Sequence, residues 1–409
     1  MYDCIVVGAG AAGMSAAIFM SRMGLNCTII EHTSRAGSKL LQTGNGKCNL
    51  TNKSLESEYY YCEDKTFVQS ILSAFDYDSL IEFFQSLGIY TYNRNGYIYP
   101  RSQTAASVRD AFLFEIQKSK VKINYDNEIK DIIKNSDSYK IILDNGYELE
   151  SKTVLFAAGL CAAPKTGSDG SILKIIEKLG IHVNTPLPAL VPLCSDSSCL
   201  KRISGTRIMA IARFTINGKQ MIEEYGEIQF TDYGLSGIPI FQISHGVISA
   251  LKKGGKCDII IDPFYDYSEE ELADVLEKIY QSKGKNDISA IYNALINANI
   301  AEVLIERANL SRNTDLSSED FKKLSKSFKN LKFRITGHKD FDMAQVSQGG
   351  VDIKELHSLS LESKKNKGIY FAGEIIDVDG ICGGYNLSWA FSSAHYACEA
   401  INKSLGRKG

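Results

Sequence analysis

The sequence has little of several features that mark common protein classes. Among its 409 residues there are one tryptophan and seven prolines, and the formal net charge is only -2. A charge so near zero argues against a protein that binds nucleic acid by overall electrostatic attraction, although it does not exclude a local basic patch. No uninterrupted apolar run reaches the roughly 18 residues of a membrane span. We therefore expect neither a nucleic-acid partner nor a membrane partner.

Metal and disulfide patterns are also missing. The six histidines show no metal spacing such as HExxH, so the sequence predicts no metal site. No G-x-S-x-G nucleophile elbow occurs either. We interpret the protein as cytoplasmic, because Asp3 stands where a signal peptide would carry positive charge, and the ten cysteines are then free thiols. Cys194 and Cys199 have the CxxxxC spacing of flavin disulfide reductases but lie far from the first strand, so we expect incidental thiols.

What the sequence does have is concentrated at its start. Residues 3–7 are typical of a buried parallel strand, residues 14–23 of a helix, and residues 26–30 of a second strand. Between the first strand and the helix lies a GxGxxG turn made of Gly8, Ala9, Gly10, Ala11, Ala12 and Gly13.

Each residue type in this turn has a physical reason. Gly8 permits the tight turn, Gly10 lets a pyrophosphate approach the backbone, and Gly13 lets the helix pack closely on the sheet. The helix N-terminus offers N–H groups and partial positive charge to phosphates. Glu31 follows the second strand, about 20 residues after the turn, where an acid accepts hydrogen bonds from a ribose. The pattern predicts a dinucleotide site.

Residues 32–53 are rich in glycine, asparagine and threonine. Such a segment exposes backbone donors and can wrap a polar ligand, and it directly follows the nucleotide acid. We predict that this loop contacts the cofactor. A strand at 152–158 ends in Ala158 and Gly159, where a backbone can approach a ligand closely.

Other periodic segments predict further elements. We expect helices over 66–88, 105–118 and 171–179, one aromatic strand over 90–99, and strands over 121–125, 129–134 and 139–143, with a hairpin turn at 144–146. Residues 207–217, 219–224 and 227–230 alternate like antiparallel strands, 256–262 is another strand, and 268–331 is helical throughout. Residues 348–351 are read as a turn, and a last helix runs from 387 to 404.

These elements predict an α/β fold. A Rossmann-type domain would be built from both chain ends, residues 1–190 and 337–409, with an inserted β and helical domain over 191–336. The returning segment carries a strand ending in Gly373 and Glu374, then Asp377, and then a Gly383-Gly384 turn that opens the last helix. A helix N-terminus aimed at an isoalloxazine would stabilise the reduced ring.

Several long motifs together resemble one known family. They are residues 8–13, 44–52, 188–193, 230–237, 349–351 and 371–387, in order along the whole chain. The sequence is similar to the BaiN/YhiN family of FAD-dependent oxidoreductases, which includes aminoacetone oxidase and a bile-acid dehydro-intermediate reductase. The resemblance implies a Rossmann-type FAD domain and an inserted barrel-plus-helices domain. The sequence departs from the usual family pattern at Lys47, Ile238, Gln345–Gln348 and Cys382, and these departures leave the identity of the substrate undetermined.

The resemblance implies a set of cofactor-binding residues and two candidate catalytic tyrosines. The FAD contacts are expected at Gly8, Ala9, Gly10, Ala11, Ala12, Gly13, Glu31, His32, Lys39, Thr43, Gly44, Asn45, Gly46, Lys47, Cys48, Asn49, Ile129, Ala158, Gly159, Gly373, Glu374, Asp377, Gly383, Gly384, Tyr385 and Asn386. Tyr233 and Tyr385 are the candidate proton donors, with simple packing as the alternative role.

The favoured reaction is reduction of a carbon–carbon double bond conjugated to a carbonyl, on an apolar ring substrate, with NAD(P)H as a transient donor. A second GxGxxG for a nicotinamide is absent. Three other hypotheses stay open at this point: an amine oxidase that produces hydrogen peroxide, an RNA-directed flavoprotein, and a flavin-binding redox sensor without turnover.

Overall fold

The computed structural model describes residues 1–283, 292–311 and 315–406, and the chain divides into two units. Unit 1 comprises Met1–Pro188 and Gln345–Gly409, and unit 2 comprises Ala189–Ala344. Each unit has its own cluster of buried apolar side chains. Both chain ends therefore belong to one folded unit, and the other unit is an insertion within it.

Unit 1 is built on a seven-stranded sheet in the order β7-β2-β1-β10-β9-β8, with β19 paired to the second half of β10. The parallel strands are β1 (Tyr2–Val7), β2 (Cys27–Ile30), β7 (Lys122–Asn124), β10 (Glu148–Phe156) and β19 (Ile369–Phe371). The strands β8 (Ile129–Lys134) and β9 (Tyr139–Leu143) extend the sheet with antiparallel pairs. This sheet confirms the predicted Rossmann-type α/β fold class.

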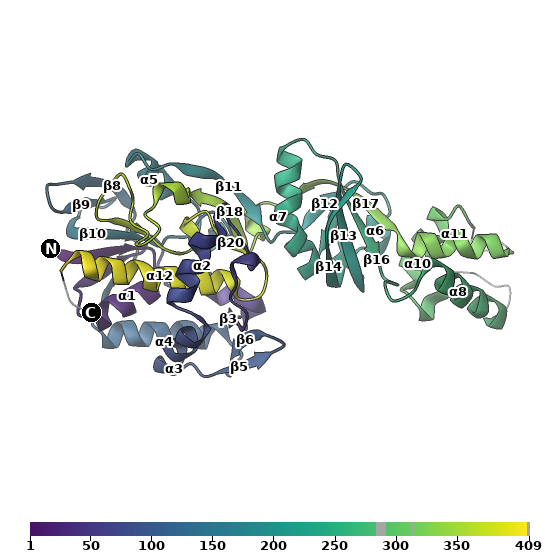
Figure 1. Cartoon of the computed structure of the whole chain (residues 1–409), viewed down its shortest axis with the longest axis horizontal. Helices are drawn as coiled ribbons and strands as arrows, with labels where there is room; N and C mark the ends of the chain where they lie inside the picture. Colours follow the sequence, from purple (N-terminus) through teal and green to yellow (C-terminus); the bar gives the residue numbers. More distant parts are fainter. Residues whose placement is uncertain (284–291, 312–314, 407–409) are drawn as a thin grey trace. The chain divides into compact units, whose positions relative to one another are not determined.

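Two helices from opposite ends of the chain lie side by side in unit 1 (Figure 1). They are α1 (Ala11–Arg22) and α12 (Tyr385–Ser404). The thiol of Cys398 on α12 donates to the backbone oxygen of Ala16 on α1, at 3.5 Å. The two helices thus bury small and apolar side chains against each other beside the sheet.

The remaining elements of unit 1 cover the sheet or form small additional sheets. The helices are α2 (Lys65–Ala74), α3 (Tyr77–Ser86), α4 (Ala105–Lys118) and α5 (Leu173–Lys178). One small sheet has the order β3 (Thr51–Asn52), β6 (Tyr97–Pro100), β5 (Thr91–Arg94). The other two sheets have two strands each: β4 (Tyr60–Tyr61) with β20 (Asp379–Gly380), and β11 (Val183–Ala189) with β18 (Val346–Val351).

Unit 2 contains a closed antiparallel barrel and a group of helices. The barrel order is β12 (Leu193–Ser195), β15 (Gly234–Ser236), β14 (Lys219–Phe230), β13 (Arg207–Ile216), β16 (Cys257–Asp262) and β17 (Leu331–His338). The helices are α6 (Leu200–Ile203), α7 (Ile238–Lys252), α8 (Glu269–Lys283), α10 (Ala298–Arg307) and α11 (Ser318–Lys329). In the described part of the chain, no helix combines the length and apolar character that a membrane crossing requires.

Some predicted elements were wrong in extent. The expected helix over 66–88 is two helices, because the Asp76 carboxylate accepts a hydrogen bond from the Ser79 backbone and starts α3 afresh. The helix expected from residue 14 begins at Ala11, and the helix expected from residue 387 begins at Tyr385. In both cases the first turn of the helix consists of residues that were expected to belong to the glycine-rich turn before it.

Three strand predictions were also wrong. The expected single strand over 90–99 is the β5–β6 hairpin, which turns at Asn95 and Gly96 with positive φ angles. The two strands expected over 219–230 are one strand, β14. The turn expected at 348–351 is part of strand β18. The helical region expected over 268–331 is confirmed for α8, α10 and α11, but its end was wrong, because Leu331 is the first residue of strand β17. Residues 284–291 and 312–314 lie outside the described residues.

The aromatic cluster around α1 and α12 generates a prediction about stability. The ring of His395 stacks on Phe75 at 4.2 Å and meets Phe19 edge-on at 5.0 Å. Its Nδ1 atom is buried without a hydrogen-bond partner in the described structure. Burial lowers the pKa of His395, with Glu399 acting weakly in the opposite direction. The native state therefore favours the neutral ring.

A lowered histidine pKa makes the unfolded state bind the proton more strongly, so stability falls as the pH drops through the unfolded value of about 6.5. We expect the melting temperature to fall more between pH 8 and pH 5.5 in the wild type than in His395→Phe. Thermal unfolding of both proteins at the two pH values tests this. Equal falls in the two proteins would contradict the assignment.

Candidate functional site

The glycine turn is shaped by close backbone contacts. A Cβ atom on Gly13 would lie 1.9 Å from the carbonyl oxygen of Gly8, and one on Gly8 would lie 2.6 Å from the Cα of Ala158. A Cβ on Gly10, in contrast, would meet nothing nearer than a backbone oxygen at 4.0 Å. The space beside Gly10 is therefore open, as the approach of a pyrophosphate requires.

Helix α1 begins directly at this opening. Gly10 is its N-cap residue, and no side chain caps the helix there. The first backbone N–H groups of a helix have no partner within the helix, and the helix dipole adds positive potential at this end. Ala11, Ala12 and Gly13 form this first turn. The arrangement suits the phosphates of a dinucleotide.

Glu31 lies at the end of β2 and is held in a fixed orientation. One carboxylate oxygen accepts a hydrogen bond from the backbone N–H of Ala9 at 2.8 Å. The other accepts from the backbone N–H and the hydroxyl of Thr33, at 2.9 and 2.7 Å. A carboxylate has about four acceptor positions, so Glu31 can still accept hydroxyl groups of a ribose.

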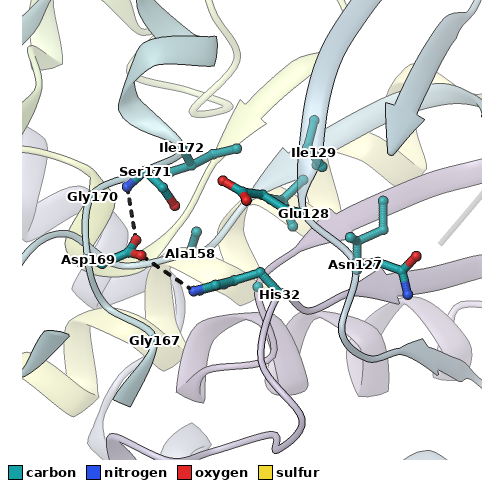
Figure 2. Close-up of a pocket in the computed structure, with 13 residues that line it drawn as sticks. His32, Asn127, Glu128, Ile129, Ala158, Gly167, Asp169, Gly170, Ser171 and Ile172 are labelled. Carbon is teal, nitrogen blue, oxygen red and sulfur yellow. Dashed lines mark hydrogen bonds and ion pairs between the residues drawn. The ribbon is translucent and has the colours of Figure 1, made fainter. Parts of the chain in front are cut away.

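A pocket opens beside His32, the residue that follows Glu31 (Figure 2). The ring of His32 lies between two acids, with Nδ1 3.6 Å from Glu31 and Nε2 3.8 Å from Asp169. The lining includes four residues that the sequence predicted as cofactor contacts: Gly8, His32, Ile129 and Ala158. Its position next to the ribose acid makes it the candidate adenosine end of the site.

Sequence reasoning missed other lining residues of this pocket. They are Asn127 and Glu128 before β8, and Asp169, Gly170, Ser171 and Ile172 before α5. In Figure 2 they come from two segments that face His32 from different sides. Asp169 accepts a hydrogen bond from the Ser171 backbone at 2.9 Å, which fixes this loop. The Thr-Gly-Ser-Asp-Gly run at 166–170 was the available signal.

The loop predicted to wrap the ligand has an unusual backbone. Its segment from Leu40 to Gly46 contains two short 3-10 turns separated by a kink, where Thr43, Gly44 and Asn45 have non-helical backbone angles. Gly44, Asn45 and Gly46 all have positive φ angles. Successive residues of this kind direct their N–H groups toward one side, as in an anion-binding nest. The Asn49 side-chain oxygen is buried without a hydrogen-bond partner in the described structure. A ligand donor would satisfy it.

Three other residues of this loop have different surroundings. Cys48 is fully buried, and burial raises the pKa of its thiol to about 12, which indicates packing and not reactivity. Lys47 is exposed. Lys39 ends in an ion pair with Glu374, with 2.6 Å between the ammonium and carboxylate atoms. The structure thus brings the loop to the end of β19.

The returning segment supplies the other side of the site. Glu374 accepts a hydrogen bond from the Ser347 backbone at 2.9 Å, and a Cβ on Gly159 would lie 3.8 Å from its carboxylate. Asp377 accepts hydrogen bonds from the Gly349 backbone and from the Asn184 amide, at 2.9 and 2.8 Å. Asp377 therefore also holds strands β11 and β18 in place.

The second helix N-terminus lies at the glycine pair before α12. Gly384 is the N-cap residue without a side-chain cap, and a Cβ on it would lie 2.6 Å from the backbone of Thr51. Asn386 exchanges hydrogen bonds with the backbone of Gly380, at 2.8 and 2.7 Å. Asn386 thus positions the turn. Gly383 and Gly373, both with positive φ angles, complete the predicted residues of this segment.

The two candidate tyrosines lie in different units. In unit 1, the ring of Tyr385 is buried and packs on Tyr59 at 4.8 Å between ring centres. Burial raises the pKa of Tyr385 well above its usual value. In unit 2, the ammonium of Lys339 lies 3.8 Å over the ring of Tyr233.

All ten cysteines are free thiols, including Cys194 and Cys199. Among the described residues, no group of three or more acidic, histidine or cysteine side chains is arranged to hold a metal ion. The candidate site in unit 1 offers backbone N–H groups as donors and, as acceptors, carboxylates and the buried Asn49 amide oxygen, and these fit FAD.

Comparisons with known proteins agree with this geometry. The family described as "HI0933-like protein Rossmann domain" matches residues 2–400. The chain is 33% identical to a 3-dehydro-bile acid delta(4,6)-reductase from Clostridium scindens over 97% of this chain and 98% of that protein. It is 28% identical to a ribosomal RNA dihydrouridine synthase from Haemophilus influenzae, over 96% of each chain.

One solved structure extends the comparison of the fold. It is a 3-ketosteroid delta1-dehydrogenase from Sterolibacterium denitrificans, in complex with 1,4-androstadiene-3,17-dione. The TM-score is 0.54, the identity 12%, and the match covers 98% of this chain and 99% of that chain. At this identity the likeness concerns the fold alone.

The opening beside Gly10 generates a prediction about cofactor binding. Gly10 has φ -78° and an extended backbone that other residues adopt without strain, so Gly10→Val can fold. Its side chain would occupy the space for the pyrophosphate. We expect the purified variant to lose most of its flavin absorbance while its circular dichroism spectrum stays like that of the wild type.

Gly10→Ala serves as a graded control, because its single methyl group has room in the structure. We expect it to retain more flavin than Gly10→Val. A valine variant with full flavin absorbance would show that the pyrophosphate does not lie beside Gly10.

Proposed function

The chain belongs to the HI0933-like family of Rossmann-domain proteins, and from this premise we propose that it reduces a carbon–carbon double bond conjugated to a carbonyl in an apolar ring substrate. It is an FAD-dependent oxidoreductase, and the earlier resemblance to the BaiN/YhiN family is confirmed. The substrate class we propose is a steroid or bile-acid enone.

One observation carries this proposal. The reductase of Clostridium scindens is 33% identical over nearly the full length of both proteins. Its name describes a 3-oxo bile acid in which double bonds at positions 4 and 6 are reduced. A 3-oxo group next to such bonds forms a conjugated enone. The family match over residues 2–400 supports the same chemistry in this chain.

The second type of relative supports the reaction class but suggests another substrate. Making dihydrouridine saturates a uracil ring at a double bond that is conjugated to a carbonyl. The ribosomal RNA dihydrouridine synthase of Haemophilus influenzae is 28% identical to the chain. Reduction of a conjugated double bond is therefore the common chemistry. The higher identity to the bile-acid reductase favours an apolar steroid or bile-acid ring over a uracil base as the substrate.

The residues of unit 1 can hold FAD in an extended form. The opening beside Gly10 and the first turn of α1 would bind the pyrophosphate, and Glu31 the ribose. The N-terminus of α12 would place positive potential beside the ring. When bound, FAD supplies the hydride for the reduction. A nicotinamide donor, NADH or NADPH, would bind transiently and reduce the FAD beforehand.

A proton donor must complete the reduction at the carbon next to the carbonyl, and we assign this role to Tyr385. Its raised pKa keeps the phenol protonated at neutral and moderately alkaline pH. Tyr60 donates a hydrogen bond to the Tyr385 carbonyl at 3.0 Å, which fixes the residue at the start of α12. Tyr233 in unit 2 is the second candidate for the same role.

The electron donor can be identified by an anaerobic titration. We expect NADH or NADPH to bleach the flavin band of the purified holoprotein, and subsequent addition of a 4-en-3-oxo steroid to restore it. Spectra recorded between 350 and 550 nm, where flavins absorb, would follow both steps on the order of minutes. A band that neither donor bleaches, together with amine-dependent peroxide in air, would replace the proposal with the amine oxidase.

The proton donor can be tested by Tyr385→Phe. Because general acid catalysis contributes about 10²–10⁴-fold, we expect turnover of the enone to fall at least about 100-fold. Flavin content and the rate of bleaching by the nicotinamide should stay unchanged. Tyr59→Phe is the matched control, since it removes a neighbouring hydroxyl and keeps the ring contact. Full turnover in Tyr385→Phe would exclude it as the donor.

A further inference from the structure

The β5–β6 hairpin of unit 1 is a rigid element with no role in the site so far. Its turn is Asn95-Gly96, with φ angles of 54° and 91°. This is the two-residue turn that matches the twist of the flanking strands. The Asn93 side chain accepts a hydrogen bond from the Gly96 backbone at 2.8 Å, and Lys53 donates its backbone N–H to Gly96 at 2.9 Å. The hairpin is thus tied at its tip.

The pairing of the strands places four particular side chains on one face. Arg94 pairs with Tyr97, and Tyr92 pairs with Tyr99. Side chains that pair directly, or that lie two residues apart on one strand, share a face of a sheet. Ile98, between the two tyrosines, points to the opposite face and is buried. We call the side bearing Tyr92, Arg94, Tyr97 and Tyr99 the tyrosine face.

The tyrosine face adjoins both loops of the candidate flavin site. A Cβ on Gly44 would lie 3.7 Å from the ring of Tyr99, and one on Gly383 would lie 2.9 Å from the ring of Tyr97. The Asn52 amide donates to the Gly383 carbonyl at 3.1 Å, which ties β3 of the same small sheet to the start of α12. We call the backbone turns at residues 8–13, 44–46 and 383–384 the cofactor cradle. The tyrosine face therefore borders the part of this cradle where we place the flavin ring.

Arg94 gives this face a positive charge that nothing nearby neutralises. Its side chain is exposed, and within the described residues no ion pair or hydrogen bond of its guanidinium is recorded. Burial raises the pKa of Tyr99, and the charge of Arg94 acts in the opposite direction. The rings of Tyr92 and Tyr99 stack at 5.9 Å beside it.

We propose that the tyrosine face is a substrate subsite in which Arg94 binds a carboxylate on the ring substrate while the rings of Tyr97 and Tyr99 contact its flat apolar body. This inference rests on the proposed function and makes it more specific. A guanidinium presents two parallel donors that match a carboxylate, and tyrosine rings offer apolar contact with a hydroxyl at the edge. The substrate is accordingly an acid, not a neutral steroid.

Arg94 and the tyrosine rings could also bind a phosphate group next to a flat base, as in a nucleotide. The carboxylate is favoured because the tyrosine face holds a single cation, whereas nucleic-acid surfaces repeat cations along the backbone. The chain also has an overall charge near zero. The experiment below separates the two sources.

The test compares one steroid acid with its neutral ester on the holoenzyme. The probes are 3-oxo-chol-4-en-24-oic acid and its methyl ester, which share the enone and differ in charge. In Arg94→Gln we expect KM for the acid to rise about tenfold or more, with kcat unchanged and the ester unaffected. Arg94→Lys should recover part of the loss, because it keeps the charge and loses the fork.

Arg22→Gln is the control, since Arg22 is an exposed arginine in the last turn of α1, at the other end of that helix from the glycine turn. Its KM values should equal those of the wild type. Equilibrium dialysis of the acid gives a second readout that does not depend on turnover, and there too only Arg94→Gln should weaken binding. Equal losses for acid and ester, or the same effect in Arg22→Gln, would overturn the subsite.

The outcomes also separate this inference from the proposed function. Reduction of both probes with the same KM in wild type and Arg94→Gln would leave the reaction standing and refute the subsite. Absence of reduction, with binding of the acid alone weakened in Arg94→Gln, would refute the reaction and support the subsite. If Arg94→Gln lost binding of a 5′-phosphorylated uridine oligonucleotide and still bound the acid normally, Arg94 would be a phosphate-binding residue and the proposal would be overturned.

Discussion

The structure of unit 1 depends on the close approach of three backbone segments at the glycine turn. The start of α1 lies so near the end of β1 that a Cβ on Gly13 would sit 1.9 Å from the Gly8 oxygen. On its other side, Gly8 meets the backbone after β10 at Ala158. A side chain at either glycine would force these segments apart, and in a domain stabilised by only about 5–15 kcal/mol such overpacking is a large penalty. The same closeness puts the helix N-terminus, Glu31 and the Ala158-Gly159 end at one edge of the sheet.

The returning end of the chain meets this edge because β10 pairs with β1 on one side and with two further strands in succession on the other. Its first half pairs with β9, and its second half pairs with β19 in parallel, with Phe156 opposite Phe371 and their rings stacked at 5.3 Å. β19 then leads directly to Glu374 and, a few residues on, to the start of α12. The site thus receives two helix N-termini without side-chain caps, each equivalent to about half a positive charge. An anionic cofactor compensates these charges in a chain that is otherwise near neutral.

How much of this the sequence predicts depends on whether the signal is local. The glycine turn, Glu31 and strands β8 and β9 were predictable, because turn residues and short-range alternation carry their own information. The strand at 348–351 was not, because its glycines serve partners far away in sequence. A Cβ on Gly349 would lie 2.8 Å from the Thr185 oxygen, and one on Gly350 would lie 2.5 Å from the Ile375 oxygen. In sequence such glycines look like a turn. The pocket residue Asn127 also lacked a local signal, since only the fold brings its segment to His32, whereas Asp169 lies in the Thr-Gly-Ser-Asp-Gly run. The Asn95-Gly96 turn had a clear signal, which the surrounding tyrosines concealed.

The arrangement also explains how one family can act on different substrates with one cofactor site. The residues that shape the cradle act largely through backbone atoms: N–H groups of the first helical turns, glycines that admit close contacts, and loops fixed by Glu374 and Asn386. Few substitutions are tolerated at Gly8, Gly13 and Gly384, because each of these glycines lies directly against another stretch of backbone. The β5–β6 hairpin differs, since its tyrosine face uses side chains and joins the cradle mainly through Asn52 and ring contacts. A change at an exposed position such as Arg94 alters the charge offered to a substrate and leaves the backbone of the cradle intact. Substrate preference can therefore diverge on this face while cofactor binding is retained, so relatives can share the fold and the reaction class and differ in what they reduce.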